Sequence, residues 1–154
     1  MLEANTKEDI ENVLEKHSES FEEADFSLED KLPLIDECFK EDHVEGILYN
    51  LGKVNDEWSQ KTSDLMLKMS PTSMKVTLKM LREGKHLDLK ECLQMEYRLV
   101  RRCCEDSDFY EGVRALLIDK DNKPKWNPVK LADVNDTQLT RYFSTLSNGQ
   151  ELKL

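Results

Sequence analysis

Apolar residues recur three or four positions apart along most of this chain, which is the spacing of one face of an α-helix. The longest run covers residues 89–105 and places these apolar residues on one face: Leu89, Cys92, Leu93, Leu99, Val100 and Cys103. Residues 71–82 carry a second stripe of apolar residues at helical spacing. The one strand-like run, ALLI at 115–118, is short and continues a helical pattern. We therefore predict an all-α chain with about seven helices.

Three helix starts stand out in the second half of the chain. Ser70 precedes Pro71, and serine at the N-cap followed by proline at the first helical position favours a helix start. Asp88 with Glu91 three residues later predicts a capping box. Ser107 is expected to cap a further helix over residues 108–118, which a charged turn then ends.

Shorter helices are expected on either side of these three. We expect helices over 7–16, 28–40, 43–51 and 56–69, capped by Thr6, Ser27 or Asn55 where a capping residue is present, and a last one after Asn135 that ends near residue 146. Residues 17–26 are expected to form a loop and residues 147–154 to fray. Gly52 and Gly84 are candidates for helix ends.

The composition limits the partners that the chain can have. With 22 basic and 32 acidic residues in 154, the net charge is −10, which argues against a surface that follows nucleic-acid phosphates. No apolar run approaches the ~20 residues of a membrane span. We expect no targeting segment, because the acidic N-terminus differs from secretory signals and transit peptides. The four cysteines show neither a disulfide framework nor CxxC spacing, which favours a reducing compartment.

Candidate chemistry is sparse. His17, His43 and His86 lie far apart in the sequence without a second ligand at helical spacing, so we interpret them as surface residues and expect no metal site. The sequence contains no GxSxG elbow, SxxK motif or glycine-rich phosphate loop. Ser70 and Ser107 are interpreted as capping residues.

Glu96 lies within the apolar face of residues 89–105. A buried carboxylate must be paired, hydrogen-bonded or protonated, because an unpaired buried charge is costly. Two interpretations remain open: a structural ion pair, for which we favour Arg114 as the partner, and a catalytic acid or base with a raised pKa.

Residues 120–126 form a compact basic and aromatic cluster of Lys120, Lys123, Lys125 and Trp126. It is either a solvated turn with one anchoring ring or an edge that binds phosphate or an adenine ring. Gly112 lies inside the preceding helix, where glycine costs about 1 kcal/mol relative to alanine. We expect that its missing side chain lets another backbone come close.

Several of these residues together resemble a known family. Glu96, SD at 107–108, EG at 111–112, Ala115, and a lysine and proline ahead of Trp126 are similar to the C-terminal signature of the crotonase (enoyl-CoA hydratase) superfamily. With SPTSMKVTLKML at 70–81 and LQMEYRLVRRC at 93–103, the chain resembles the 3-hydroxyisobutyryl-CoA hydrolase branch. The resemblance is strongest over residues 69–126 and covers only the last part of that family's chain.

The resemblance implies a fold, an activity and a cellular location. It implies the C-terminal helical region of a crotonase without its β-rich spiral core, with residues 1–69 packing on that core, 70–126 as the helical subdomain and 127–154 as a tail. It implies thioester hydrolysis in valine degradation in mitochondria, with coenzyme A present only as part of the substrate and no other cofactor. The family's water-activating carboxylate and oxyanion-binding amides are expected upstream, because nothing in this sequence matches them.

The resemblance also bears on individual residues. In crotonases, a lysine after the EG helix often lines the coenzyme A pocket. Lys120 matches this lysine after a small shift in the sequence. The resemblance implies the same substrate-binding role, more weakly, for Lys123 and Trp126. Leu116 departs from the usual phenylalanine. Glu96 resembles a glutamate that recurs in the C-terminal domain of the family and takes no part in catalysis. The expected partners are an acyl-CoA substrate in the full-length protein and a crotonase core or neighbouring subunit. The alternatives are a non-catalytic helical interaction module and an acyl-CoA carrier.

Overall fold

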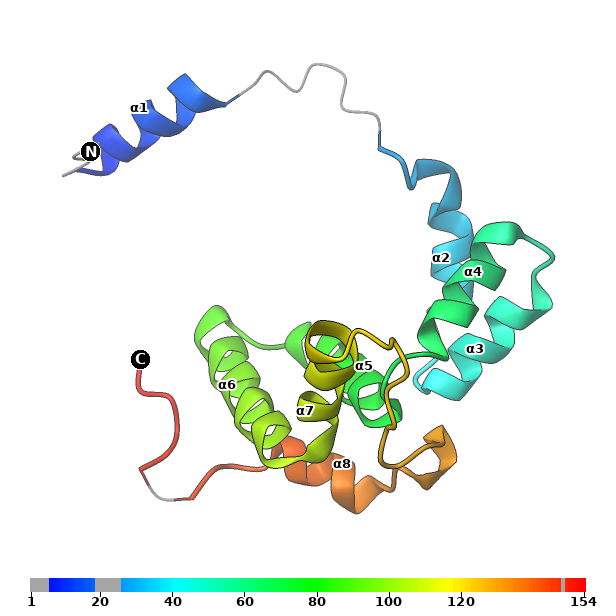
Figure 1. The fold of residues 1–154 in the computed structure, drawn as a ribbon. Coiled ribbons are helices and arrows are strands. Elements are labelled where there is room, and N and C mark those ends of the chain that lie inside the picture. The colour runs from blue at the N-terminus through cyan, green and yellow to red at the C-terminus, as the bar shows by residue number, and fades with distance from the viewer. Residues whose placement is uncertain (1–5, 19–25, 148) are drawn as a thin grey trace. The chain divides into compact units, whose positions relative to one another are not determined.

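The structure is a computed structural model that describes residues 6–18, 26–147 and 149–154 (Figure 1). Every regular element in these ranges is helical, which confirms the predicted all-α class. The α-helices are α1 (Lys7–His17), α2 (Leu32–Cys38), α3 (Val44–Lys53), α4 (Glu57–Met66), α5 (Pro71–Gly84), α6 (Leu89–Glu105), α7 (Ser107–Val113) and α8 (Asp136–Phe143). Two 3-10 turns, η1 (Glu29–Lys31) and η3 (Leu131–Asp133), and a π-helical turn, η2 (Arg114–Ile118), complete the described elements.

The chain divides into two compact units, Met1–Pro33 and Leu34–Leu154. In the first unit, α1 begins at the predicted capping residue: Thr6 and Asp9 form a reciprocal capping box. The predicted division at residue 69 falls inside the second unit, because Leu78 of α5 packs against the cluster built by α2–α4. Looser packing of residues 1–69 stays a prediction.

The second unit contains two clusters of buried apolar residues. Cys38, Ile47 and Leu51 form the first cluster, from α2 and α3, with Trp58 and Met66 of α4 packed against it. The second cluster joins α5, α6 and α8 and consists of Val76, Met95, Leu99 and Tyr142, each of them at most 6% exposed. These two clusters fix α5 between two layers of helices and so position the site described below.

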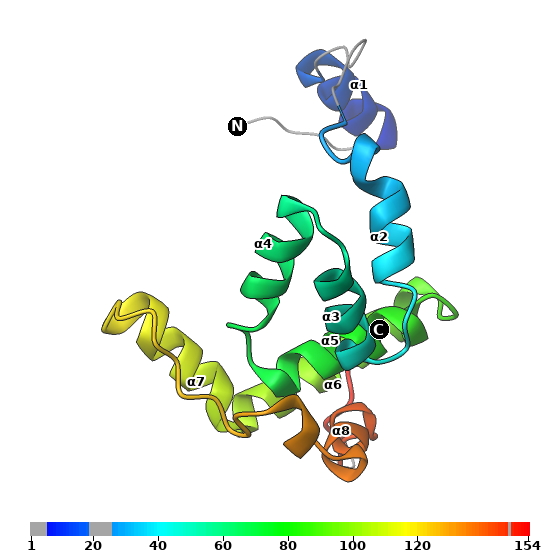
Figure 2. The same cartoon turned by 90° about the vertical axis from the view of Figure 1, so that its right-hand side faces the viewer.

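The α7–η2 segment doubles back after α6. The loop that follows η2 runs back along α7, as Figures 1 and 2 both show, and its backbone is bonded to that helix. The N–H of Lys125 donates to Glu111 at 2.7 Å and the N–H of Asn127 donates to Asp108 at 2.8 Å. Two carboxylates of α7 therefore hold the returning chain.

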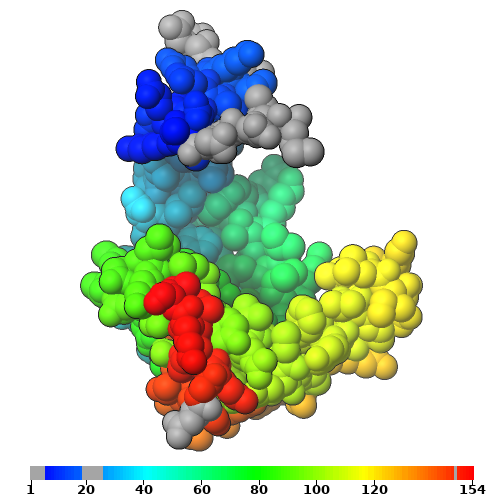
Figure 3. All heavy atoms as spheres, turned by 90° about the vertical axis from the view of Figure 1, so that its left-hand side faces the viewer, coloured from blue at the N-terminus to red at the C-terminus, as the bar shows by residue number. Residues whose placement is uncertain are grey.

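The C-terminal tail lies over α6 (Figure 3) instead of fraying as predicted. Arg98 of α6 pairs with Glu151 at 2.9 Å, and Gln94 donates to the carbonyl of Leu152 at 3.2 Å. Glu151 also accepts the N–H of Leu146 at 2.6 Å. The polar face of α6 supplies these bonds, so the hydrophobic pattern alone gave no sign of them.

The predicted helix starts were correct where the capping side chain bonds to the first turn of its own helix. Ser70 accepts from the N–H of Ser73, and Asp88 forms the predicted capping box with Glu91. Ser107 was wrongly assigned as an N-cap: α7 begins one residue earlier, with Asp106 in that position. The carboxylate of Asp106 makes no capping bond, because it bonds instead to Arg141 and Tyr142 of α8.

Several smaller boundaries also shifted. The predicted helix at 28–40 is a 3-10 turn followed by α2, with no side-chain cap from Ser27, and α4 is capped by Asp56 in place of Asn55. Gly84 is the last residue of α5, as predicted, and Gly52 is the last but one residue of α3. Most of the loop predicted at 17–26 lies outside the described residues. No helix in the ranges that the structure describes is long and apolar enough to cross a membrane.

Candidate functional site

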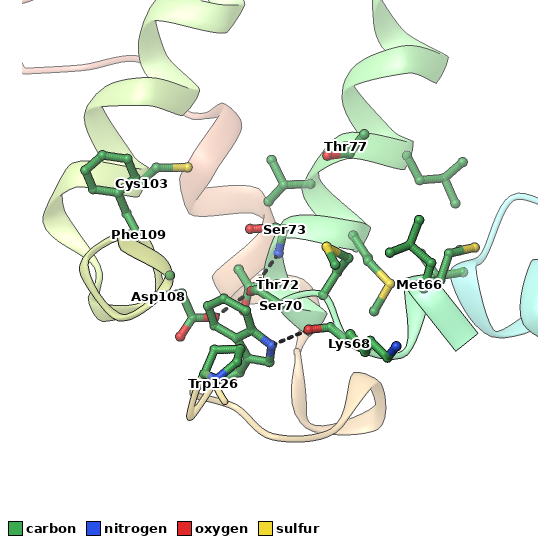
Figure 4. Close-up of a pocket in the computed structure, with 18 of the residues that line it drawn as sticks. Met66, Lys68, Ser70, Thr72, Ser73, Thr77, Cys103, Asp108, Phe109 and Trp126 are labelled. Carbon is green, nitrogen blue, oxygen red and sulfur yellow. Dashed lines mark hydrogen bonds between the residues drawn. The ribbon is translucent and has the colours of Figure 1, made fainter. Parts of the chain in front are cut away.

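A broad groove with a mainly apolar lining lies between α4, α5 and the α7–η2 segment (Figure 4). Its volume is about 1060 Å³. The lining side chains used below are Leu65, Met66, Met69, Leu81, Phe109, Leu116, Leu117 and Trp126. The methionines fill part of it, as flexible thioether side chains do in irregular apolar spaces.

Much of this lining is open to water. Leu81 is 63% exposed, Leu116 57% and Leu117 68%. Each Å² of apolar surface left in water forgoes about 25 cal/mol of stabilisation, and a contiguous exposed patch of this kind marks an interaction or ligand-binding surface. The groove is therefore a surface that favours a covering partner or ligand.

Trp126 lies in the groove and anchors the loop that follows η2. Its indole N–H donates to the carbonyl oxygen of Lys68 at 2.9 Å. A Cβ at Gly112 would lie 3.3 Å from the Cη2 atom of the Trp126 ring. Gly112 thus makes room for a side chain, where the sequence led us to expect a backbone.

Ser70 joins three segments at one end of the groove. Its hydroxyl accepts from Ser73 and donates to the carboxylate of Asp108 at 2.5 Å, which also accepts the N–H of Asn127 (Figure 4). A serine hydroxyl bonded in this way, 5% exposed, is a structural link. Its interpretation as a cap is confirmed.

Arg114 lies at the centre of a cluster of carboxylates. Its guanidinium bonds to both oxygens of Glu111 at 2.9 and 2.8 Å, to Asp119 at 2.5 Å and to Asp121 at 2.8 Å. It also donates to the carbonyl of Lys123 at 3.3 Å. The planar fork of arginine suits several simultaneous carboxylate contacts, which the single ammonium of lysine cannot reproduce.

These bonds shift the acid–base properties of the cluster. The Arg114 hydrogen bonds, followed by the N–H of Lys125, lower the pKa of Glu111 to about 2. Arg114 in the same way lowers the pKa of Asp121, and the three carboxylates raise the pKa of Arg114 above its usual value. Glu111, Asp121 and Arg114 are therefore charged at neutral pH.

The predicted substrate-binding lysines lie on the loop that this cluster holds. Lys120 and Lys123 are exposed, as is Lys125, and no described residue pairs with any of their ammonium groups. Trp126 lies at the end of the same loop but faces the groove. The structure therefore brings the three lysines together in one loop and uses the indole ring for packing.

Comparisons with known proteins place the chain in a family. The enoyl-CoA hydratase/isomerase family matches residues 1–143. The chain belongs to this family. The mitochondrial 3-hydroxyisobutyryl-CoA hydrolases of rat and human are 44% and 43% identical to it over 96% of its length. The chain spans 39% of the length of these relatives and matches their C-terminal part.

Two solved structures share the fold of this chain. A carnitinyl-CoA dehydratase from Mycobacterium thermoresistibile matches 91% of the chain with a TM-score of 0.80 and 29% identity, over 40% of its own length. An enoyl-CoA hydratase from Rhodobacter sphaeroides matches 96% with a TM-score of 0.82 and 24% identity, over 44% of its own length, which supports the fold alone. In both proteins this fold is one part of a longer chain.

The predicted ion pair between Glu96 and Arg114 is not present. Glu96 is exposed on α6, while Arg114 is occupied by Glu111, Asp119 and Asp121. The prediction that Glu96 is paired with Arg114 was therefore wrong, because part of the apolar face of α6 is left exposed.

Only half of that face is covered within the described residues. Met95 and Leu99, 4% and 5% exposed, pack against α5 and α8. The stripe beside them is exposed: Leu89 by 77%, Leu93 by 39% and Val100 by 60%. Glu96 lies in this second stripe, since residues three and four apart share a helix face. We call Leu89, Leu93, Glu96 and Val100 the outer stripe of α6.

The structure gives no support to a metal site. No group of three or more histidine, cysteine, aspartate or glutamate side chains in the described part of the chain could hold a metal ion. Burial raises the pKa of the thiols of Cys38 and Cys103, which makes them less reactive. These thiols are packing residues.

Sequence analysis missed a polar network at the junction of α6, α7 and α8. Asp106 accepts two bonds from Arg141 at 3.0 and 3.2 Å and a short bond from the Tyr142 hydroxyl. Arg141 also reaches Glu105 at 2.7 Å. Burial, followed by the bond to Asp106, raises the pKa of Tyr142 above its usual value. A tyrosine inside the apolar pattern of the last helix was the one available signal, because a buried hydroxyl needs a partner.

Proposed function

We propose that this chain is the C-terminal helical part of a 3-hydroxyisobutyryl-CoA hydrolase and has no thioesterase activity by itself. In the whole protein, thioester hydrolysis of 3-hydroxyisobutyryl-CoA in mitochondrial valine degradation would use a carboxylate and oxyanion-binding amides supplied outside these residues. The observation that carries the proposal is the match to 39% of the length of the hydrolases, over 96% of this chain.

The described residues offer little that could perform the reaction. Ser70, one of the two serines that line the groove, is tied to Asp108 and to the start of α5. We call residues 119–125 the lysine loop. The carboxylates in and beside this loop are paired with Arg114. A general base must be free to take a proton from water, and a guanidinium-bound carboxylate with a low pKa is a poor base.

We further propose that the lysine loop forms part of the edge that holds coenzyme A. Lys120 and Lys123 extend into solvent without partners among the described residues, as ligands of phosphate groups must before substrate binds. Trp126 would then act by supporting the loop. Coenzyme A would enter as part of the substrate, and no other cofactor is proposed.

The test is a thioesterase assay with 3-hydroxyisobutyryl-CoA, in which release of the free thiol is followed. The chain alone is expected to give the rate of buffer, while the rat or human hydrolase provides the positive control. Turnover by the chain alone that is lost on Glu96→Gln or Asp108→Asn would contradict the proposal. Such a result would assign a catalytic role to the carboxylate whose substitution abolishes turnover.

A second candidate function is a non-catalytic interaction module that docks on a crotonase core or on a full-length relative. The exposed groove and the outer stripe of α6 favour it. Sedimentation of the chain with and without the full-length hydrolase separates the two candidates. A stable complex without any change in the turnover of the hydrolase supports the interaction module, and separate sedimentation supports the hydrolase part.

A further inference from the structure

The loop between η2 and Trp126 has an unusual backbone. Lys120 and Asn122 have φ values of 56° and 54°, in the left-handed region that non-glycine residues rarely adopt. The N–H of Asn122 donates to the carbonyl of Ala115 at 3.1 Å, and the guanidinium of Arg114 donates to the carbonyl of Lys123 at 3.3 Å. Such a backbone persists only where its surroundings hold it, and here Arg114 is part of what holds it.

In the same loop, the acidic side chains and the lysine side chains have different surroundings. Asp119 and Asp121 alternate with lysines in the sequence DKDNKPK at 119–125. Both aspartates bond to Arg114, and Glu111 joins them from α7. Lys120, Lys123 and Lys125 are left exposed and without described partners.

Removing the guanidinium would undo this separation. Three carboxylates within reach of one another would repel, and the flexible lysine side chains nearby are the cations available to neutralise them. Lysines engaged in this way are less able to hold an anionic ligand. The availability of the three ammonium groups therefore depends on Arg114.

We infer that Arg114 is a positioning residue for a polyphosphate-binding edge formed by Lys120, Lys123 and Lys125. Arg114 does not touch the ligand, but it binds the acidic side chains of the loop and fixes its backbone, so that the ammonium groups face solvent. The inference rests on the proposed function in one respect: the pyrophosphate of coenzyme A is the polyphosphate that this edge would hold.

The test is a titration of the chain with inorganic pyrophosphate at low ionic strength, followed by NMR on the backbone amides of residues 119–126. Arg114→Gln is expected to weaken binding by about three- to tenfold, the effect of losing one or two exposed charge contacts. The control is Arg101→Gln, which removes the same charge from an exposed position on α6 and should change the affinity by less than about twofold.

A rescue experiment separates positioning from simple support of the fold. Adding Asp119→Asn and Asp121→Asn to Arg114→Gln removes two carboxylates that would otherwise compete for the lysines. Recovery of the affinity to within about twofold of the unmodified chain supports the inference. An affinity that stays low in the triple variant overturns it. If Arg114→Gln does not fold, Arg114→Lys is compared with Arg101→Lys: both variants keep the charge, so a loss of affinity at position 114 alone supports the inference and equal affinities overturn it.

A parallel titration with coenzyme A distinguishes the two ideas. Pyrophosphate binding that depends on Arg114, without coenzyme A binding, supports the inference and removes the coenzyme A edge from the proposed function. Coenzyme A binding that is insensitive to Arg114→Gln overturns the inference and leaves the proposed function. Failure to bind either compound overturns the inference together with the coenzyme A edge.

Discussion

The α5–α6–α8 cluster and the α7–η2 segment are adjacent in the sequence but are stabilised in different ways. In the cluster, Val76, Met95, Leu99 and Tyr142 are at most 6% exposed. In the π-helical turn, Leu116, Leu117 and Ile118 are between 57% and 69% exposed, and the bonds of Arg114 hold the chain in place. The first region therefore carries its own core, while the second depends on charge and leaves its apolar residues available.

This difference separates the apolar surfaces that the described chain covers from those that it leaves exposed. A buried apolar side chain gains about 1.5–3 kcal/mol relative to an exposed one, whereas an exposed ion pair contributes about 0–1 kcal/mol. The cluster thus contributes more to the stability of the second unit than the α7–η2 segment does. The α7–η2 segment gains its full stabilisation only when its apolar residues are covered.

The largest expected change in stability comes from a substitution inside the α5–α6–α8 cluster. Leu99→Ala should lower the free energy of unfolding by about 2–5 kcal/mol, because it removes buried methyl groups and leaves a cavity. Val100→Ala, at the neighbouring and 60% exposed position, should change it by less than about 0.5 kcal/mol. Urea unfolding followed by circular dichroism measures both. Equal losses at the two positions would show that the outer stripe of α6 is covered in solution.

An intermediate effect concerns the charge cluster and depends on pH. The pKa of Glu111 is lowered from its ordinary value of 4.5 to about 2 in the folded chain. The stabilisation that follows from this shift is complete above pH 4.5 and disappears as the pH falls towards 2. Glu111→Gln should therefore lose less stability than the unmodified chain between these pH values.

Thermal unfolding at several pH values measures this difference. Asp121 and other carboxylates with lowered pKa values titrate in both proteins, so the comparison of the two slopes isolates Glu111. Gln at position 111 keeps the size of the side chain. Parallel pH profiles would mean that the bond between Glu111 and Arg114 does not contribute to folding.

The smallest expected effect is at Glu96. Because Glu96 is exposed in the outer stripe of α6, Glu96→Ala should change the free energy of unfolding of the chain by less than about 0.5 kcal/mol. A loss of roughly 3–5 kcal/mol, the cost of breaking a buried ion pair, would mean that this carboxylate has a partner in solution. The same substitution in the full-length protein then reports whether the remaining part of the protein covers the stripe.

The sequence predicted those features whose causes are local. The capping boxes at Thr6 and Asp88 need a side chain and the next turn of its own helix, so three residues suffice to recognise them. The helical class followed in the same way from spacing. Of the two interpretations of Trp126, the anchoring ring agrees with its hydrogen bond to the carbonyl of Lys68, while the substrate-binding role stays a prediction.

The sequence could not reveal which of several possible partners a residue would choose. Asp106 could cap α7 but bonds to α8, and Arg114 could reach Glu96 but is held by three closer carboxylates. The apolar face of α6 is wide enough for two partners, and its pattern does not say that one half stays exposed. These outcomes depend on how the helices pack, which no single segment encodes.

The outer stripe of α6 also affects how the chain behaves at high concentration. Exposed leucine and valine side chains attract one another whenever two molecules meet, and a net charge of −10 opposes each encounter. Salt shortens the range of this repulsion to about 8 Å at physiological ionic strength, and acid removes it by protonating carboxylates. The acidic surface therefore acts as a colloidal barrier against self-association through the exposed outer stripe of α6.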